Sequence, residues 1–163
     1  MSIYTFITDT PLGKIQAAAS DNNLVGLWFL GQKYFPSDTT AWIKKPDYPV
    51  FADLKIWLKE YFEGKEPKTQ VSLLPVGSEF RQAVWKQLLE IPWGKTTTYG
   101  TISATLYAAG IKAPAQAVGG AVGHNPISLL IPCHRVLGAD GSLTGFAGGL
   151  DKKRALLELE WGL

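Results

Sequence analysis

The chain has 163 residues, a formal net charge of +2, and hydrophobic residues at 46% of its positions. A chain of this length can bury a good core without disulfides, and its single cysteine excludes both an internal disulfide and a thiolate-rich zinc site. The N-terminal stretch MSIYTFITDT lacks the basic and apolar regions of a signal peptide, and no apolar run reaches the roughly 18 residues of a membrane span. We therefore expect a cytoplasmic protein that does not contact a membrane.

Short segments of β-strand character open the chain. The segments SIYTFIT (2–8), KIQAAAS (14–20) and LVGLWFL (24–30) are separated by the turn sequences TPLG and DNN. Apolar and polar positions alternate most clearly in the first of them, as in a half-buried strand. The pattern predicts a meander of short antiparallel strands.

An amphipathic helix is predicted to follow the strands. In FADLKIWLKEYF (51–62) the apolar residues recur close to helical spacing, and Gly64 ends the pattern. The next segment, GKEPKTQVSLLPVG (64–77), has Pro and Gly at both ends and little periodicity. We therefore place a boundary between an N-terminal lobe (1–76) and a C-terminal lobe (77–163).

The C-terminal half begins with helical patterns. Ser78 is expected to cap a helix that ends at IPWGK, and TTTYGTISATLYAAG opens with a threonine cap and closes at Gly110. After the turn IKAP, AQAVGGAVGHN begins another short helix, so the pair is a helix-turn-helix candidate, with an ordinary helical hairpin as the alternative. The second helix is rich in Ala and Gly, which leave a surface that a neighbouring element or a phosphate backbone could approach closely. Residues 81–163 hold eight basic and five acidic residues, a bias compatible with a polyanionic partner.

The only cysteine, Cys133, lies in ISLLIPCHRVLG (127–138) directly before His134. A lone cysteine after an apolar run is often an inert buried residue. Here Arg135 adds a fixed positive charge that would favour the thiolate, which is the nucleophilic form. The following loop, GADGSLTGFAGG, could offer backbone amides to a substrate oxygen.

A histidine that activates a thiol is normally oriented by a carboxylate. Asp140 lies in an Asp-Gly turn and Asp151 in the first turn of a closing helix, so turn formation and helix capping are the expected roles of these two residues. Glu158 and Glu160 are two residues apart on that helix, so only one of them can point toward the core. Their spacing does not decide which.

The chain resembles the O6-alkylguanine-DNA alkyltransferase family, also called methylated-DNA–protein-cysteine methyltransferases. The resemblance is strongest in two segments, FRQAVWKQLLEIPWGKTTTYG and AVGGAVGHNPISLLIPCHRVLGADGSLTGFAGGLDKKRALLELE, and the second contains the motif PCHRV. The resemblance covers essentially the whole chain. It implies an α/β fold with a ribonuclease-H-like N-terminal lobe built on an antiparallel sheet, and a helical C-terminal lobe with a winged-helix-like helix-turn-helix. In that family the helix-turn-helix enters the minor groove of double-stranded DNA and the O6-alkylguanine is flipped out to reach the cysteine.

The resemblance also assigns roles to single residues. Cys133 would accept the alkyl group irreversibly, His134 would act as base through a water, and Glu160 would orient His134. Tyr99 would press on the target phosphate and hydrogen-bond the flipped base, and Asn125 would hold the active-site turn together. The residues expected to contact DNA or substrate are Tyr99, Ala115, Gln116, Gly119, Arg135, Val136 and Ala147. The backbone carbonyls of Cys133 and Val136 and the backbone amide of Ala147 would contact the guanine edge.

The chemistry needs no metal and no organic cofactor, because a thiolate attacks the alkyl carbon directly and the product is a stable thioether. We expect a monomer without an obligate protein partner, in which each molecule repairs one lesion. Other readings are an alkyltransferase-like binding protein, which would lack the acceptor cysteine, a Cys-His-Glu hydrolase that turns over, and a plain DNA-binding regulator.

The sequence departs from the family pattern at Gln116. Well-known members have an arginine there, which fills the gap left by the flipped base. A glutamine can hydrogen-bond an orphaned base but brings no charge. The alternative is a helix-surface glutamine with no special task.

Overall fold

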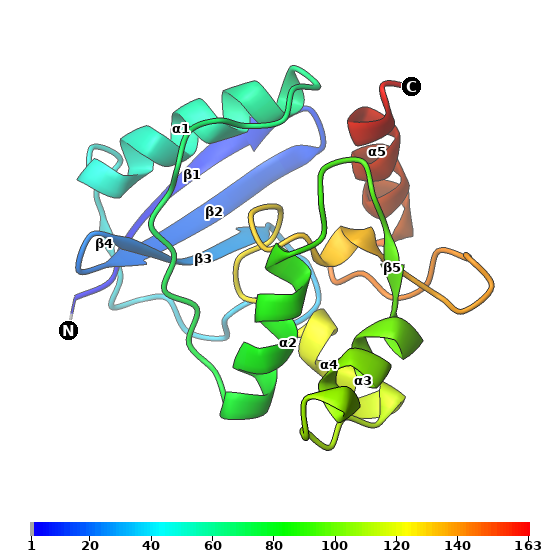
Figure 1. Ribbon diagram of the computed structural model, residues 1–163. Helices are drawn as coiled ribbons and strands as arrows, with labels where there is room; N and C mark the ends of the chain where they lie inside the picture. The colour runs from blue at the N-terminus through cyan, green and yellow to red at the C-terminus, as the bar shows by residue number, and fades with distance from the viewer. Residues whose placement is uncertain (1) are drawn as a thin grey trace.

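Three strands form the antiparallel meander that the sequence predicts (Figure 1). The computed structural model describes residues 2–163, and in it β1 (Tyr4–Thr10), β2 (Gly13–Ser20) and β3 (Asn23–Phe29) pair in the order β3-β2-β1. A two-residue strand, β4 (Ile43–Lys44), pairs in parallel with β1 and was missed by the sequence analysis. The fold is mixed α/β, as expected, but the sheet is not wholly antiparallel.

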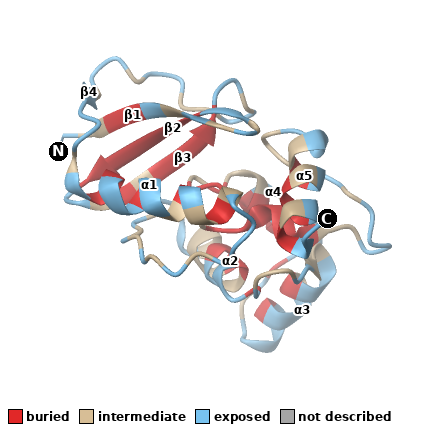
Figure 2. Cartoon of the chain, turned by 90° about the horizontal axis from the view of Figure 1, so that it is seen from above, coloured by how far each residue is buried: buried red, intermediate tan, exposed pale blue. Residues whose placement is uncertain are grey.

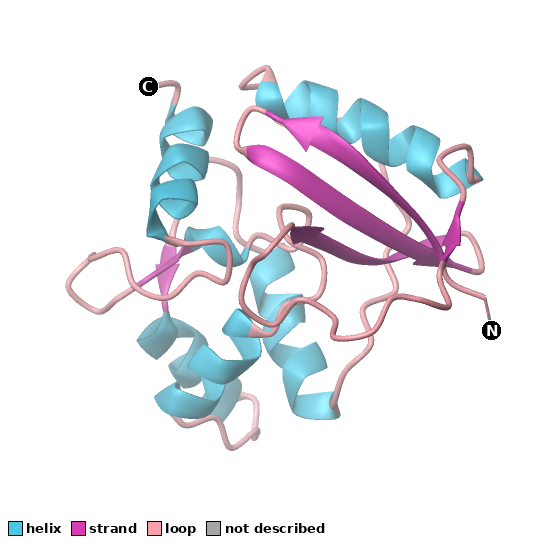
Figure 3. Ribbon diagram, turned by 180° about the vertical axis from the view of Figure 1, so that it is seen from behind, coloured by secondary structure: helices cyan, strands magenta, loops and turns pink. Residues whose placement is uncertain are grey.

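The predicted amphipathic helix is α1 (Pro49–Phe62), which lies along one face of the sheet (Figure 3). It begins two residues before the predicted start, because Pro49 suits the first turn of a helix, where its missing N–H needs no partner. Its buried side chains are Val50, Phe51, Leu54, Leu58 and Tyr61. Tyr61 therefore faces the interior near the C-terminal end of the helix.

The segment between α1 and the second half of the chain follows the edge of the sheet. Ser72 O accepts a hydrogen bond of 2.8 Å from Leu24 N, and Leu74 N donates one of 2.8 Å to Leu24 O. One buried hydrophobic cluster contains side chains from both halves of the chain, and Figure 2 shows buried segments in the sheet and in the helices alike. The division at residue 76 stays a prediction.

The C-terminal half is helical. Its helices are α2 (Glu79–Leu89), α3 (Tyr99–Ala108), α4 (Ala115–Gly123) and α5 (Leu150–Trp161). The two predicted caps are confirmed, because the side chain of Ser78 accepts from Arg81 N and that of Thr98 accepts from Thr101 N. The helices α3 and α4 form the helix-turn-helix, and Trp85 of α2 holds α4 by donating from Nε1 to Ala121 O at 2.8 Å.

Two pairs of residues join the start of the helix-turn-helix to the segment after the cysteine. β5 (Thr97–Thr98) pairs in parallel with β6 (Val136–Leu137), directly before α3 and directly after the short 3-10 turn Cys133–Arg135. This pairing fixes Tyr99 and Cys133 relative to each other. Within the described residues, no helix has the length and apolar character needed to cross a membrane.

Candidate active site

Cys133 lies at the end of a tight loop that Asn125 stabilises from within. Asn125 Nδ2 donates to Ile131 O at 2.7 Å, and Asn125 Oδ1 accepts from Ile127 N at 3.0 Å. Leu129 adopts a left-handed conformation, with φ of 72°, so the loop is sharply turned between these two bonds. Asn125 itself is buried. These two hydrogen bonds agree with the expected role of Asn125, which is to hold the active-site turn together.

His134 and Glu160 meet in the interior. Nε2 of His134 is 2.5 Å from Oε2 of Glu160, and both side chains are fully buried. Glu158, two residues earlier on α5, is exposed. The structure therefore resolves the choice that the sequence left open, and places Glu160 against the histidine.

The pair consists of an ionised carboxylate and a neutral imidazole. Burial opposes the charge on Glu160, but the hydrogen bonds from His134 and Arg135 and the positive charge of Arg135 outweigh it, and the pKa of Glu160 falls to about 2. Burial lowers the pKa of His134 more than Glu160 raises it. Arg135 already neutralises the carboxylate, so a second buried cation would be poorly stabilised. A neutral His134 that donates from Nε2 keeps the lone pair on Nδ1, for which residues 2–163 offer no hydrogen-bond partner.

The thiol of Cys133 is neutral at rest. Its side chain is buried, and this burial raises the pKa of Cys133 above the usual value, against the opposing effects of the Asn125 hydrogen bond and the Lys153 charge. The thiolate must therefore form during the reaction, through a base.

The expected role of Arg135 needs correction. We expected its charge to favour the thiolate and the residue to contact DNA or substrate. Its Nε instead donates to Glu160 Oε1 at 2.7 Å, its Nη1 donates to Ile91 O at 2.7 Å, and the guanidinium packs over the ring of Trp93. The guanidinium is used to hold the carboxylate because Glu160 is the buried anion within its reach.

Lys153 of α5 is the cation whose charge reaches Cys133, and the sequence analysis missed it. The side chain is fully buried, and its Nζ donates to Val136 O at 2.5 Å, Thr144 O at 2.7 Å and Gly145 O at 3.2 Å. Burial lowers the pKa of Lys153 to about 8. Its position on the same helix face as Leu156, Leu157 and Glu160 is the sequence signal that could have revealed it.

Tyr61 is a second residue that the sequence analysis missed. Its hydroxyl donates to Glu160 Oε2 at 2.7 Å and lies 3.4 Å from His134 Nε2. Tyr61 is one of the periodically spaced apolar residues of the predicted helix 51–62, although a buried tyrosine hydroxyl normally has a partner. A residue of the N-terminal half thus contacts the buried pair directly.

Tyr99 is hydrogen-bonded to the loop before α5. The Tyr99 hydroxyl donates to Thr144 O at 3.1 Å, and a Cβ at Gly145, whose φ is 56°, would be 3.3 Å from that hydroxyl. Burial raises the pKa of Tyr99. The carbonyl of Cys133 accepts from Val136 N, and the carbonyl of Val136 accepts from Lys153.

The small residues of α4 form an open surface. Ala115, Gln116 and Gly120 are exposed, and a Cβ at Gly119 or Gly120 would meet no atom within 4 Å. Gln116 lies on this surface near the start of the helix. The surface can approach another backbone closely.

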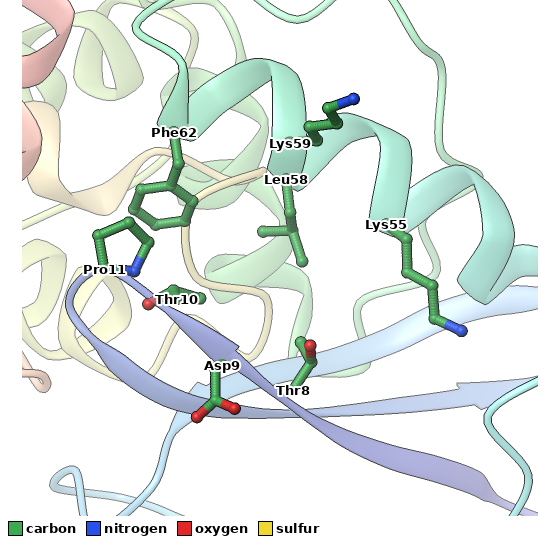
Figure 4. A pocket seen from close by; sticks show the side chains of 8 residues that line it. All are labelled: Thr8, Asp9, Thr10, Pro11, Lys55, Leu58, Lys59 and Phe62. Carbon is green, nitrogen blue, oxygen red and sulfur yellow. The ribbon is translucent and has the colours of Figure 1, made fainter.

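Two adjoining hollows lead to the cysteine. The inner one has a volume of about 10 Å³ and is lined by Cys133, by residues at the C-terminal end of α4 and just after it, and by the 145–147 loop. The outer one, of about 250 Å³, shares four lining residues with it and also includes Tyr99 and Gly119, and Ala147 lines both. A further hollow of about 250 Å³ lies between the β1–β2 turn and α1 (Figure 4) and shares no lining residue with either. Its polar side chains, two threonines, an aspartate and two lysines, include no paired nucleophile and base.

No group of three or more His, Cys, Asp and Glu side chains is placed to hold a metal ion anywhere in residues 2–163. The only cysteine is Cys133, which is free and buried. The site therefore offers a buried thiol, a neutral imidazole, an ionised carboxylate and a nearby ammonium group. Such a set can form a thiolate on demand and use it to attack an electrophilic carbon.

The chain matches two models of the same family, "6-O-methylguanine DNA methyltransferase, DNA binding domain" over residues 79–161 and "6-O-methylguanine DNA methyltransferase, ribonuclease-like domain" over residues 3–76. Methylated-DNA–protein-cysteine methyltransferases of Mycobacterium tuberculosis and Haemophilus influenzae are 46% and 40% identical to it. The alignments cover 93% and 98% of this chain, and 88% and 87% of those proteins. The crystal structure of the Mycobacterium tuberculosis OGT in complex with DNA has a TM-score of 0.87 at 41% identity, covering 98% of this chain and 93% of that one. The chain therefore belongs to the 6-O-methylguanine DNA methyltransferase family, whose curated members are named methylated-DNA–protein-cysteine methyltransferases.

Proposed function

We propose that this protein repairs O6-alkylguanine in double-stranded DNA by moving the alkyl group irreversibly to Cys133. The observation that carries the proposal is the arrangement of Cys133, His134 and Glu160 beneath the 145–147 loop. A single buried thiol lies at the bottom of an open hollow, next to a neutral histidine held by an ionised glutamate. The DNA complex of the Mycobacterium tuberculosis relative supports DNA as the partner.

The reaction begins with proton removal from Cys133. His134 Nδ1 carries the lone pair that takes the thiol proton, through a water, while Nε2 stays hydrogen-bonded to Glu160. Glu160 stabilises the imidazolium that forms, and the Lys153 ammonium stabilises the thiolate. The thiolate and the imidazolium therefore form together, as the proton leaves the thiol.

Alkyl transfer follows in line. The Sγ–carbon bond forms as the carbon–O6 bond breaks, and the bonding electrons pass to guanine, which takes up one proton at N1 or O6. The thiol has lost one proton and guanine has gained one, so the step balances. The thioether product has no good leaving group, so Cys133 is not regenerated and each molecule acts once.

The helix-turn-helix supplies the DNA contacts of this proposal. The open surface of α4, including Ala115, Gln116 and Gly119, lies in the minor groove, and Tyr99 contacts the flipped nucleotide. In this proposal the carbonyls of Cys133 and Val136 and the amide of Ala147 contact the guanine edge. Arg135 has no direct substrate contact in this scheme, because its guanidinium is bonded to Glu160 and Ile91.

The protein acts in this proposal as a cytoplasmic monomer, without metal, organic cofactor or obligate protein partner, and O4-alkylthymine is a further substrate to be tested. A titration tests the stoichiometry. Increasing amounts of duplex DNA containing O6-methylguanine are added to a fixed amount of protein, and repaired guanine is counted. We expect repair to stop at one guanine for each protein molecule. Continued product formation would identify a turnover hydrolase and contradict the proposal.

A further inference from the structure

The loop after β3 in the N-terminal half touches the loop that covers Cys133. The backbone N–H of Lys33 donates to Ala147 O at 3.0 Å. The next residue, Tyr34, stacks on His124, which follows α4, with ring centroids 3.8 Å apart and an interplanar angle of 27°. The same loop therefore contacts both the C-terminal end of α4 and the 145–147 loop.

Tyr34 is held in an uncommon backbone conformation. Its φ of 63° lies in the left-handed region, which a bulky aromatic residue rarely adopts. Such conformations persist where the surroundings determine them, and they cluster at ligand-binding sites. At Tyr34 the determining contacts are the His124 ring, the hydrogen bond of the preceding residue, and the Lys33 ammonium 5.2 Å from the ring centroid.

The side chain of Tyr34 reaches the outer of the two hollows that lead to Cys133. Tyr34 is 49% exposed and lines the outer hollow together with Lys33, on the side that the N-terminal half supplies. Tyr99 lines the same hollow from the start of α3. The inner hollow at Cys133 has room only for a small group, so most of a nucleotide that reaches Cys133 must occupy the outer one.

We propose that Tyr34 is a substrate-binding residue that forms the N-terminal wall of the pocket for the extruded nucleotide. This inference rests on the proposed function. The ring supplies an apolar, aromatic surface to the base or sugar, as aromatic side chains do in single-stranded nucleic-acid sites. The Lys33 ammonium beside it adds a positive charge at the mouth of the pocket, where the phosphates of the extruded nucleotide pass.

Three variants test the wall. Tyr34→Ala removes the ring, Tyr34→Phe keeps the ring without the hydroxyl, and Ile56→Ala removes a comparably exposed apolar side chain of α1 that lines neither hollow. Single-turnover rates on duplex DNA with O6-methylguanine are measured over a range of protein concentrations. The rate of Cys133 alkylation by iodoacetamide, which needs no nucleotide pocket, and the unfolding temperature are measured in parallel.

Tyr34→Ala is expected to slow the limiting rate on duplex DNA by about tenfold, the effect of losing one stacking contact to a base. Tyr34→Phe should react faster than Tyr34→Ala because it keeps the stacking ring, whereas Ile56→Ala should retain the rate of the unmodified protein. Iodoacetamide should react equally with all four proteins. An unchanged duplex rate in Tyr34→Ala overturns the inference, and so does an equal fall in the duplex and iodoacetamide rates, which indicates a scaffold role. If the unmodified protein itself transfers no methyl group, the proposed function fails, and this inference falls with it.

Discussion

The hydroxyl of Tyr61 in α1 donates a hydrogen bond of 2.7 Å to Oε2 of Glu160 in α5, the same oxygen that contacts His134 Nε2. A residue from the N-terminal half thus helps to position the carboxylate beside the buried histidine. Both side chains are buried, so the bond is made in a medium of low dielectric constant, where a missing donor is felt strongly.

Tyr61→Phe is expected to lower the free energy of unfolding by about 1–2 kcal/mol, because Glu160 loses one of its donors. It should also slow methyl transfer, since the carboxylate is held less firmly against His134. Tyr48→Phe is the matched control, because the Tyr48 hydroxyl only accepts an exposed bond from Asn22 N. The checks are chemical denaturation and single-turnover kinetics. Equal effects of the two substitutions would show that Tyr61 does not position Glu160.

Glu160→Gln is expected to reduce the transfer rate far more than Glu158→Gln. Only Glu160 contacts His134, and a neutral amide stabilises an imidazolium poorly, whereas Glu158 is exposed on the same helix. Single-turnover rates of both variants on duplex DNA give the comparison. Similar losses in the two variants would mean that the contact with His134 has no part in the reaction.

The same two variants give a prediction for stability against pH. The pKa of Glu160 is about 2 in the folded protein, below the value of 4.5 of an ordinary glutamate. The ionised carboxylate therefore adds its full stability above pH 4.5, and this contribution is lost as the pH falls toward 2. Denaturation curves across this range should be steeper in pH for Glu158→Gln than for Glu160→Gln, and parallel curves would contradict the assignment.

Lys153→Met is expected to slow alkylation of Cys133 at neutral pH. The substitution removes the positive charge that lowers the pKa of the thiol, and it frees the carbonyls of Val136, Thr144 and Gly145. The rate of reaction with iodoacetamide, followed against pH, should shift to higher pH. Arg154→Met, at an exposed position on the same helix, is the control and should leave the profile unchanged. An unshifted profile in Lys153→Met would show that Lys153 does not stabilise the thiolate of Cys133.

Gln116→Arg is expected to tighten binding to duplex DNA. If arginine gains one phosphate contact, the log-log dependence of binding on salt should steepen by about one unit. Gln116→Ala should slow repair of duplex DNA but hardly affect reaction with free O6-benzylguanine, which needs no base flipping. Fluorescence anisotropy at several salt concentrations and repair rates are the measurements. If both variants behave like the unmodified protein, Gln116 does not enter the gap.

The sequence predicted the features that depend on local spacing. Ser78 and Thr98 were predictable as caps because a hydroxyl side chain directly before a helix can accept a hydrogen bond from a backbone N–H of the first turn. The strand meander and α1 followed from their patterns of apolar residues. The resemblance selected Glu160 over Glu158, a choice that helix spacing could not make because both residues lie on the same short helix.

The features that were missed depend on contacts between distant parts of the chain. β5 and β6 have two residues each, too few to show a period, and they pair across 39 positions from Thr97 to Val136. The hydroxyl of Tyr61 finds its partner 99 residues away, and nothing around Tyr61 in the sequence marks this partner. Arg135 was misassigned because adjacency in sequence to Cys133 suggested adjacency in space, whereas successive residues of a 3-10 turn point in different directions.

Intact-mass measurement of the protein after incubation with duplex DNA containing O6-methylguanine tests the central claim most directly. Cys133→Ala, which keeps the DNA-binding helices but lacks the acceptor, is the control. We predict that the unmodified protein gains the mass of one methyl group in place of one hydrogen, that peptide mapping places the gain on Cys133, and that Cys133→Ala binds the DNA without changing mass. Release of repaired guanine with no change in the mass of the protein, or a methyl group gained by Cys133→Ala, would contradict the account.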